Sequence, residues 1–331
     1  MNNNLITHEE AARNFQKQIQ FTLDNYKSHE LNFANYANIV ICGLGGSGIG
    51  GKLAMSFFKG VSSLPIEVIS GYDLPLYVNE KTLVIVSSYS GNTEETISLL
   101  DQAIKAKAKC LAMSTGGEIE KISTENNIYF LHIKPGYQPR MALGFSFSYL
   151  LLILSELFQL EIKTTLQKIV RKIEVNKLNY EEKGKDILTF FSSQLNNKFV
   201  IISGEALSSV ALRACQQIQE NAKHEIFHHT LPECNHNAIE SYYNSLPSNF
   251  IFLEGMNHER TNHRFTFLST LLEGNNCKVY KLALSENNLY GILELILILD
   301  WLSIHLSNEN QVNNMEVPNI MRLKKFLADI K

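Results

Sequence analysis

Cysteine is scarce in this chain of 331 residues, and its five cysteines follow no pairing pattern. No two of them form a C-x-x-C motif, and they stand at widely separated positions: Cys42, Cys110, Cys215, Cys234 and Cys277. A secreted disulfide framework uses an even number of cysteines, so this odd and scattered set indicates reduced thiols. We therefore expect a protein of the reducing cytoplasm.

The chain also lacks a strong charge of either sign. Its formal net charge at pH 7 is −3, and its lysines and arginines form no basic stripe. Because nucleic-acid binding depends on clustered positive charge, this composition argues against nucleic acid as a partner.

No segment has the pattern of a signal peptide or of a membrane span. The N-terminus is polar, and a capping-box pair, Thr7 and Glu10, precedes an amphipathic pattern in place of an apolar core. The longest apolar run, residues 289–306, contains Glu294 and Asp300. This run predicts a buried helix, and we expect no membrane partner.

The hydrophobic content of 45% is enough for two α/β units with cores of their own. In the first half, short apolar runs alternate with helical periods. We expect strands at 37–42, 66–70, 82–88, 108–114 and 128–133, and helices at 8–26, 47–59, 92–107, 117–126 and 142–159. The alternation predicts an α/β fold with a doubly wound parallel sheet.

The pattern restarts after a helical connector rich in lysine and glutamate at 163–195. The second half predicts strands at 199–205, 250–255 and 278–284, and helices at 206–222, 258–273 and 289–307. The segments IVICGLGGSGIGGKLA and FVIISGEALSSVALRA each run from an apolar strand through glycine into a serine-bearing helix start. Either the halves are distant repeats or they share only the common β-α pattern.

We expect two doubly wound subdomains with flanking helices. The first spans residues 1–160 and includes a leading helix; the second spans residues 161–331 and includes the connector and a terminal helix. No low-complexity or proline-rich linker separates them.

Hydroxyl side chains crowd the segment SSYSGNTEET, which follows the predicted third strand and begins a predicted helix. Ser88, Ser90 and Thr93 can donate hydrogen bonds beside the free amides of that helix N-terminus, where the helix dipole favours an anion. The segment therefore predicts a site for a compact tetrahedral anion such as a monophosphate. Ordinary helix capping is the alternative, since serine, asparagine and threonine are also preferred caps.

A glycine-rich turn, GLGGSGIGG, follows the first predicted strand. Gly43, Gly45 and Gly48 match the G-x-G-x-x-G dinucleotide fingerprint, and Asp73 follows the next strand, where a ribose-binding acid could stand. The hydroxyl-rich loop argues against this reading. If the first and third strands are parallel neighbours, Ser47 shares one pocket with the hydroxyl loop, and both loops meet one phosphate.

Three further segments can carry chemistry. Arg140 stands between a proline and an apolar helix start, as a phosphate or oxyanion partner or as a surface arginine. Glu220 ends an apolar helical pattern, as a half-buried general base or as a solvated helix end. The cluster His228, His229, Cys234 and His236 suggests zinc, but its spacings do not match the usual structural ligands, and we expect no metal.

Five motifs occur in order between residues 40 and 240: GLGGSGIGG, SYSGNTEET, PGYQPRMALG, QENAKHE and PECNHNAIE. With them, the chain resembles the bifunctional phosphoglucose/phosphomannose isomerases of the sugar isomerase (SIS) domain superfamily. The resemblance extends through D-x-x-S at Asp300 to P-N-I-x-x-L-K at 318–324 and so covers nearly the whole chain. Each motif alone is moderately specific, whereas their joint order and spacing are highly specific.

The resemblance implies a role for each matching residue. The residues that it places at the substrate phosphate are Gly46, Ser47, Ser88, Ser90 and Thr93. It places Arg140 by the reacting carbons, makes Glu220 the catalytic base, and makes His236 a ring-opening group that reaches in from the partner subunit of a homodimer. Lys324 completes the site from the terminal helix, although QVNNMEVPNI departs from the family pattern before it, so the adjacent Lys325 stays an alternative.

The chemistry of an aldose–ketose isomerisation suits these residue types. One carboxylate can move a proton between C2 and C1 through a cis-enediolate, and a group that titrates near neutrality can open the sugar ring. The arginine supplies a fixed positive charge for the oxyanion. Binding of the remote phosphate orients the reacting carbons.

We expect a cofactor-free isomerase of glucose 6-phosphate and fructose 6-phosphate, with mannose 6-phosphate as a second substrate. An NAD-dependent dehydrogenase would use the glycine turn and Asp73. A non-catalytic sugar-phosphate sensor would keep the hydroxyl loop but would not need Glu220, His236 and Lys324.

Overall fold

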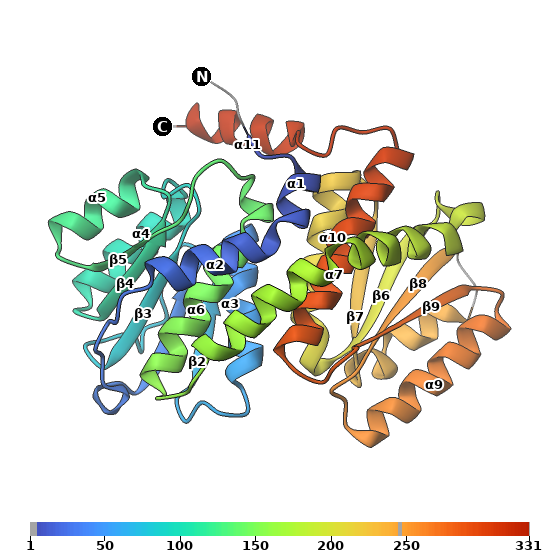
Figure 1. Ribbon diagram of the computed structural model, residues 1–331, viewed down its shortest axis with the longest axis horizontal. Helices are drawn as coiled ribbons and strands as arrows, with labels where there is room; N and C mark the ends of the chain where they lie inside the picture. Colours follow the sequence, from blue (N-terminus) through green and yellow to red (C-terminus); the bar gives the residue numbers. More distant parts are fainter. Residues whose placement is uncertain (1–4, 244–246, 331) are drawn as a thin grey trace. The chain divides into compact units, whose positions relative to one another are not determined.

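The computed structural model describes residues 5–243 and 247–330, which form two compact units (Figure 1). The first unit holds residues up to Ile6 and Arg13–Asn176, and the second holds Thr7–Ala12 and Lys177 onward. The change of unit falls inside helix α7 (Lys163–Phe190), past residue 160, where the sequence places the boundary.

The first unit contains a five-stranded parallel sheet. Its strands are β1 (Asn38–Cys42), β2 (Ile66–Ile69), β3 (Thr82–Ser87), β4 (Lys109–Ser114) and β5 (Tyr129–His132). Its helices and 3-10 turns are α2 (Phe15–Asn25), η1 (Phe33–Asn35), α3 (Gly45–Phe58), α4 (Glu94–Lys105), α5 (Gly117–Glu125), η2 (Pro139–Met141) and α6 (Leu143–Leu157).

The strand order β2-β1-β3-β4-β5 puts β1 and β3 side by side, although β2 lies between them in the sequence. The chain therefore changes winding direction between β1 and β3, which is the point where doubly wound folds bind ligands. Apolar residues of α4 and α5 pack on one sheet face, while α2 and α6 lie together with α3 against the other (Figure 1).

The second unit contains a four-stranded parallel sheet. Its strands are β6 (Lys198–Gly204), β7 (Ile226–Leu231), β8 (Ser248–Glu254) and β9 (Lys278–Ala283). Its α-helices are α1 (His8–Arg13, almost entirely in this unit), α8 (Ser208–Gln217), α9 (Glu259–Gly274), α10 (Leu289–Glu309) and α11 (Pro318–Ala328). Its shorter helical turns are η3 (Ser192–Gln194), η4 (Glu205–Leu207), η5 (Ile218–Ala222), η6 (Glu233–His236) and η7 (Ala238–Tyr242).

The order β7-β6-β8-β9 repeats the local order of the first sheet. Helix α9 covers one face through Phe265, Leu268 and Leu272, and helices α8 and α10 pack together on the other side of the unit. The two doubly wound parallel sheets confirm the fold class expected from the sequence. Strand β7 was not expected, because its two central histidines obscure the apolar pattern of an edge strand.

Helix α10 is the one helix among the described residues that is long and apolar enough to cross a membrane by length and composition. In this structure 94% of its most apolar window is buried inside the protein. Its two acidic residues, Glu294 and Asp300, are buried too, and each has a basic partner, Lys183 and Arg213 respectively. The helix is a core helix, as the sequence predicts.

Candidate functional site

The loops after β1 and β3 leave the same edge of the first sheet. Cys42 at the end of β1 pairs with Val86 of β3 in a parallel ladder, so the glycine turn and the hydroxyl loop start side by side. The backbone N–H of Tyr89 donates to Ser47 Oγ over 3.1 Å and joins the two loops directly. The predicted neighbourhood of β1 and β3 is therefore confirmed.

Two hydroxyls of the β3–α4 loop lie together at the start of helix α4. Ser88, which is 2% exposed, donates its Oγ hydrogen to Thr93 Oγ1 over 3.2 Å. Thr93 is the N-cap residue of α4, yet its side chain makes no capping hydrogen bond. The ordinary capping explanation thus does not account for this hydroxyl, and the amides of the first turn of α4 keep the geometry that suits an anion.

Ser90 lies on the exposed side of the same loop. Its Oγ accepts a hydrogen bond from the N–H of Asn92 over 3.2 Å, and its own hydroxyl hydrogen can still be donated. Gly91 has a φ of 71°, and a Cβ there would lie 1.7 Å from the carbonyl oxygen of Gly116. Only glycine fits this close approach, which fixes the path of the loop.

The loop that carries Arg140 packs on the glycine turn. A Cβ on Gly46 would lie 2.6 Å from the carbonyl oxygen of Pro139 and 3.1 Å from the Cα of Arg140. Arg140 is 5% exposed, and its guanidinium keeps its charge at all relevant pH values. One edge of the first unit therefore brings together the backbone of Gly46, the hydroxyls of Ser47, Ser88 and Thr93, and the backbone of Arg140.

Glu220 lies in the second unit, half-buried in the π turn η5 that extends helix α8. Single π turns are rare and occur often at functional sites. The turn ends at Lys223, which has a left-handed φ of 52°. The Lys223 Nζ donates to the carbonyl oxygens of Glu220, Asn313 and Glu316 over 2.7, 2.9 and 2.7 Å, so it ties the π turn to the segment before α11.

The D-x-x-S motif of α10 supports this π turn. Asp300 accepts hydrogen bonds from Arg213 over 2.7 Å and from Gln217 over 3.0 Å, and the pair is fully enclosed. Burial raises the pKa of the Asp300 carboxyl, against the opposing effect of the Arg213 charge. Ser303 accepts from Asn221 Nδ2 over 2.9 Å. The sequence shows the motif but not this contact, because α10 and α8 lie far apart in the chain.

The histidine and cysteine cluster is spread over β7 and η6. His236 is exposed on η6, whereas Cys234 beside it is 4% exposed, and burial raises the pKa of that thiol to about 11. His229 on β7 is half-buried, and burial lowers its pKa. Across residues 5–243 and 247–330, no three histidine, cysteine, aspartate or glutamate side chains are grouped to hold a metal ion.

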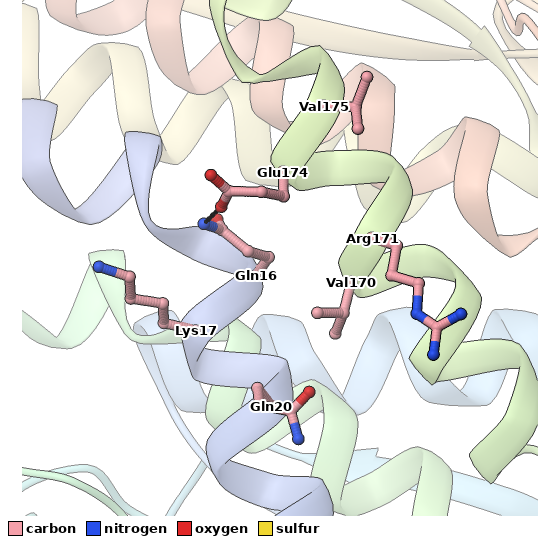
Figure 2. Close-up of a pocket in the computed structure, with 7 residues that line it drawn as sticks. All are labelled: Gln16, Lys17, Gln20, Val170, Arg171, Glu174 and Val175. Atoms are coloured by element: carbon pink, nitrogen blue, oxygen red, sulfur yellow. Dashed lines mark hydrogen bonds between the residues drawn. The ribbon is translucent and has the colours of Figure 1, made fainter.

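A groove lies between α2 and α7 of the first unit (Figure 2). It has a volume of about 460 Å³, and the residues that line it are Gln16, Lys17, Gln20, Val170, Arg171, Glu174 and Val175. The Gln16 amide donates to the Glu174 carboxylate across it. The groove shares no residue with the edge that carries Ser47, Ser88 and Thr93. We call that edge the hydroxyl edge, and the candidate site lies there.

Comparison with known proteins assigns both units to one class. The SIS domain model matches residues 32–148, and the model of the bacterial phospho-glucose isomerase C-terminal SIS domain matches residues 189–327. The C-terminal domain of glucosamine-fructose-6-phosphate aminotransferase from Francisella tularensis shares the fold, with a TM-score of 0.74 at 13% identity, over 95% of this chain and 98% of that chain. Fold and site together define a SIS protein with two such domains.

Two curated relatives narrow the class. A bifunctional phosphoglucose/phosphomannose isomerase from Caldicellulosiruptor bescii is 32% identical over 97% of this chain and 99% of its own length. A D-glucosamine-6-phosphate 4-epimerase from Sulfolobus acidocaldarius is 31% identical over 64% of this chain and 66% of its own length. The chain belongs to the family of bifunctional phosphoglucose/phosphomannose isomerases, and it is an enzyme of the isomerase class.

Proposed function

We propose that this enzyme interconverts glucose 6-phosphate and fructose 6-phosphate and also accepts mannose 6-phosphate. The observation that carries the proposal is the hydroxyl edge of the first unit, where Ser47, Ser88 and Thr93 meet an uncapped helix N-terminus. Amides and hydroxyls so placed suit a monophosphate. The family to which the chain belongs indicates that the rest of the substrate is a hexose.

Glu220 is the proton-transfer group in this proposal. Its carboxylate removes the proton from C2 of the open-chain aldose and returns it to C1 through a cis-enediolate. Its position in a half-buried π turn, held through Lys223 and Asn221, supports the role because a base must be fixed in place to work. Mannose 6-phosphate differs at C2 only, and rotation about C2–C3 presents its hydrogen to the same base.

Three further groups complete the chemistry. The His236 imidazole assists ring opening, and the Arg140 guanidinium stabilises the oxyanion without changing its protonation state. Ser90 and Gly46 join Ser47, Ser88 and Thr93 at the phosphate. Lys324 is the amine of the terminal helix.

The surface of α11 favours Lys324 over Lys325. Helix α11 buries none of its residues, and one side of it carries apolar side chains that are 40–63% exposed: Ile320, Leu323, Phe326 and Leu327. At about 100° per residue, Lys324 lies about 90° from the centre of this apolar face and Lys325 about 170°. A helix docks through its apolar face, so Lys324 reaches the covered surface and Lys325 points away from it.

We also propose that the enzyme is a cytoplasmic homodimer, uses no cofactor, and receives His236 at each site from the partner chain. The five cysteines of the described chain are free thiols, which suits a reducing compartment.

A coupled assay with glucose, fructose and mannose 6-phosphates tests the function. We expect turnover of all three sugars at pH 7.5 without added metal or nucleotide. Glucosamine 6-phosphate is assayed for C4 epimerisation in parallel, because one relative carries that name. Turnover of glucosamine 6-phosphate alone would contradict the proposal, and so would a rise in the melting temperature with NAD but not with fructose 6-phosphate.

A further inference from the structure

Tyr89 joins the loops of the first unit through its backbone. Its N–H donates to Ser47 Oγ over 3.1 Å in the glycine turn, and its carbonyl oxygen accepts from the N–H of Thr115 over 2.9 Å in the loop after β4. The residue therefore links three neighbouring loops of one sheet edge.

The side chain of Tyr89 reaches a fourth loop. Its hydroxyl donates to the carbonyl oxygen of Lys134 over 3.1 Å and accepts from the N–H of Tyr137 over 2.8 Å. The hydroxyl thus uses both its donor and an acceptor lone pair on one short stretch of backbone. This stretch leads straight into the 3-10 turn η2, which carries Arg140.

The far end of that loop packs closely on the glycine turn. Pro139 and the Cα of Arg140 press on Gly46, which has no room for a Cβ. The Tyr89 hydroxyl and the Gly46 contact therefore fix the loop at two points, one on each side of Gln138. Loss of the hydroxyl would remove one of these two points.

We propose that Tyr89 is a positioning residue that sets the place of Arg140 relative to the bound phosphate. This inference rests on the proposed function, in which Ser47 and Ser88 hold the phosphate and Arg140 stabilises the oxyanion. Binding energy from the phosphate reaches the reacting carbons only if these groups keep a fixed separation, because a misplacement of about 1 Å can lower a rate by about 100-fold.

A neutral phenol is needed for this double contact, because a phenolate has no hydrogen to donate to Lys134. Burial raises the pKa of Tyr89 to about 12, so the hydroxyl keeps its hydrogen across the range in which the enzyme can be assayed. Tyr89→Phe keeps the ring and the backbone N–H on Ser47 and removes only the two hydroxyl contacts.

Tyr149→Phe is the matched control. Tyr149 is buried in the same unit and also donates its hydroxyl to a backbone carbonyl oxygen, that of His132, over 3.1 Å. His132 lies at the end of strand β5, so loss of this hydroxyl removes a comparable bond and leaves the hydrogen bonds of Tyr89 in place.

The experiment is a double-mutant cycle of Tyr89→Phe with Arg140→Ala, with kcat for fructose 6-phosphate and the inhibition constant of inorganic phosphate as readouts. Tyr89→Phe should lower kcat about tenfold and leave phosphate inhibition unchanged. In the Arg140→Ala background, Tyr89→Phe should have almost no further effect, because the group that it positions is gone. Tyr149→Phe should leave kcat unchanged in both backgrounds.

The outcomes separate the inference from the function on which it rests. If Arg140→Ala leaves kcat unchanged, the role of Arg140 is wrong and the inference falls with it. If Arg140→Ala lowers kcat but Tyr89→Phe does not, the inference is wrong and the role of Arg140 stands. The same holds if the double variant loses kcat by the product of the two single losses. Melting temperatures of all variants are measured, and a loss of kcat in Tyr149→Phe equal to that in Tyr89→Phe would overturn the inference as a general loss of stability.

Discussion

The two sheets of this enzyme share a strand order, but the loops at their corresponding edges carry different side chains. The orders β2-β1-β3 and β7-β6-β8 place the loop after the first strand beside the loop after the third in both units. Cys42 pairs with Val86 in the first unit, and Ser203 pairs with Leu253 in the second. Two residues past these partners stand Ser88 and Gly255, so the second unit lacks the central hydroxyl.

The second edge is also filled by its own side chains. A Cβ on Gly204, the counterpart of Gly43, would lie 1.8 Å from Asn257 Oδ1, so the amide occupies that space. His258 caps helix α9 by accepting the N–H of Arg260 over 3.1 Å, whereas Thr93 leaves α4 uncapped. Side chains of the second edge thus occupy the space beside Gly204 and cap helix α9.

The difference shows that two units with the same strand order can carry different side chains at the same sheet edge. The doubly wound sheet offers an anion site at the edge where its winding changes direction, and loop residues decide whether that site stays open. In the proposed function the first unit supplies the edge that binds phosphate. The second unit carries Glu220 on a π turn that has no counterpart in the described part of the first.

The largest effect should come from Glu220→Gln, which separates the two contributions. Turnover should fall by about 10²–10⁴-fold, because a general base contributes about that much. The inhibition constant of inorganic phosphate should stay unchanged, because the phosphate edge belongs to the first unit. The control is Glu225→Gln, an exposed carboxylate five residues further on, which should keep full activity. More than about a tenth of wild-type turnover in Glu220→Gln would rule out this base.

Mixed dimers should show a smaller effect and test whether the second unit serves both chains. Homodimers of Glu220→Gln and of His236→Ala should each be inactive, but a mixed dimer places both changes in one site and leaves the other intact. With random reassortment, half of the dimers are mixed, so activity should return to about a quarter of the wild-type value. No recovery, with mixed dimers seen by mass spectrometry, would mean that Glu220 and His236 serve one site from one chain.

Metal removal should have no effect on activity. The histidines and cysteine of β7 and η6 lie in the second unit, and a zinc ion there would give that unit a ligand of its own. Activity should survive prolonged dialysis against EDTA in full. Loss of activity that zinc restores would contradict the metal-free mechanism and place His236 among metal ligands.

The sequence predicts the phosphate edge because its signals are local. Glycine, serine and threonine after short apolar runs indicate loops at strand ends, and the parallel order then brings Ser47 and Ser88 together. The contact of Gly46 with Pro139 is not visible in the sequence, because 93 positions separate them and nothing local links them. The same holds for the double contact of Tyr89.

The sequence does not predict the π turn or strand β7, and each has a physical reason. A π turn differs from an α-helix by one residue in its hydrogen-bond spacing, which the apolar pattern around Glu220 does not record. Strand β7 carries His228 and His229 where an apolar pair would be the usual signal. In the sequence these histidines suggest metal ligands rather than a strand. The contacts that hold the π turn join α8 and η5 to α10 across 82 residues of chain or more.

The most direct test of the account compares Ser88→Ala and Ser47→Ala with Ser208→Ala, the matching serine of the second unit. Binding of sorbitol 6-phosphate, which has no carbonyl group and cannot react, is measured by titration calorimetry. Each change at the first edge should weaken binding at least about tenfold, since a hydrogen bond to a charged group contributes about 1.5–3 kcal/mol. Ser208→Ala should leave affinity unchanged. Equal loss in Ser208→Ala, or unchanged affinity in Ser88→Ala, would contradict the claim that only the first edge binds phosphate.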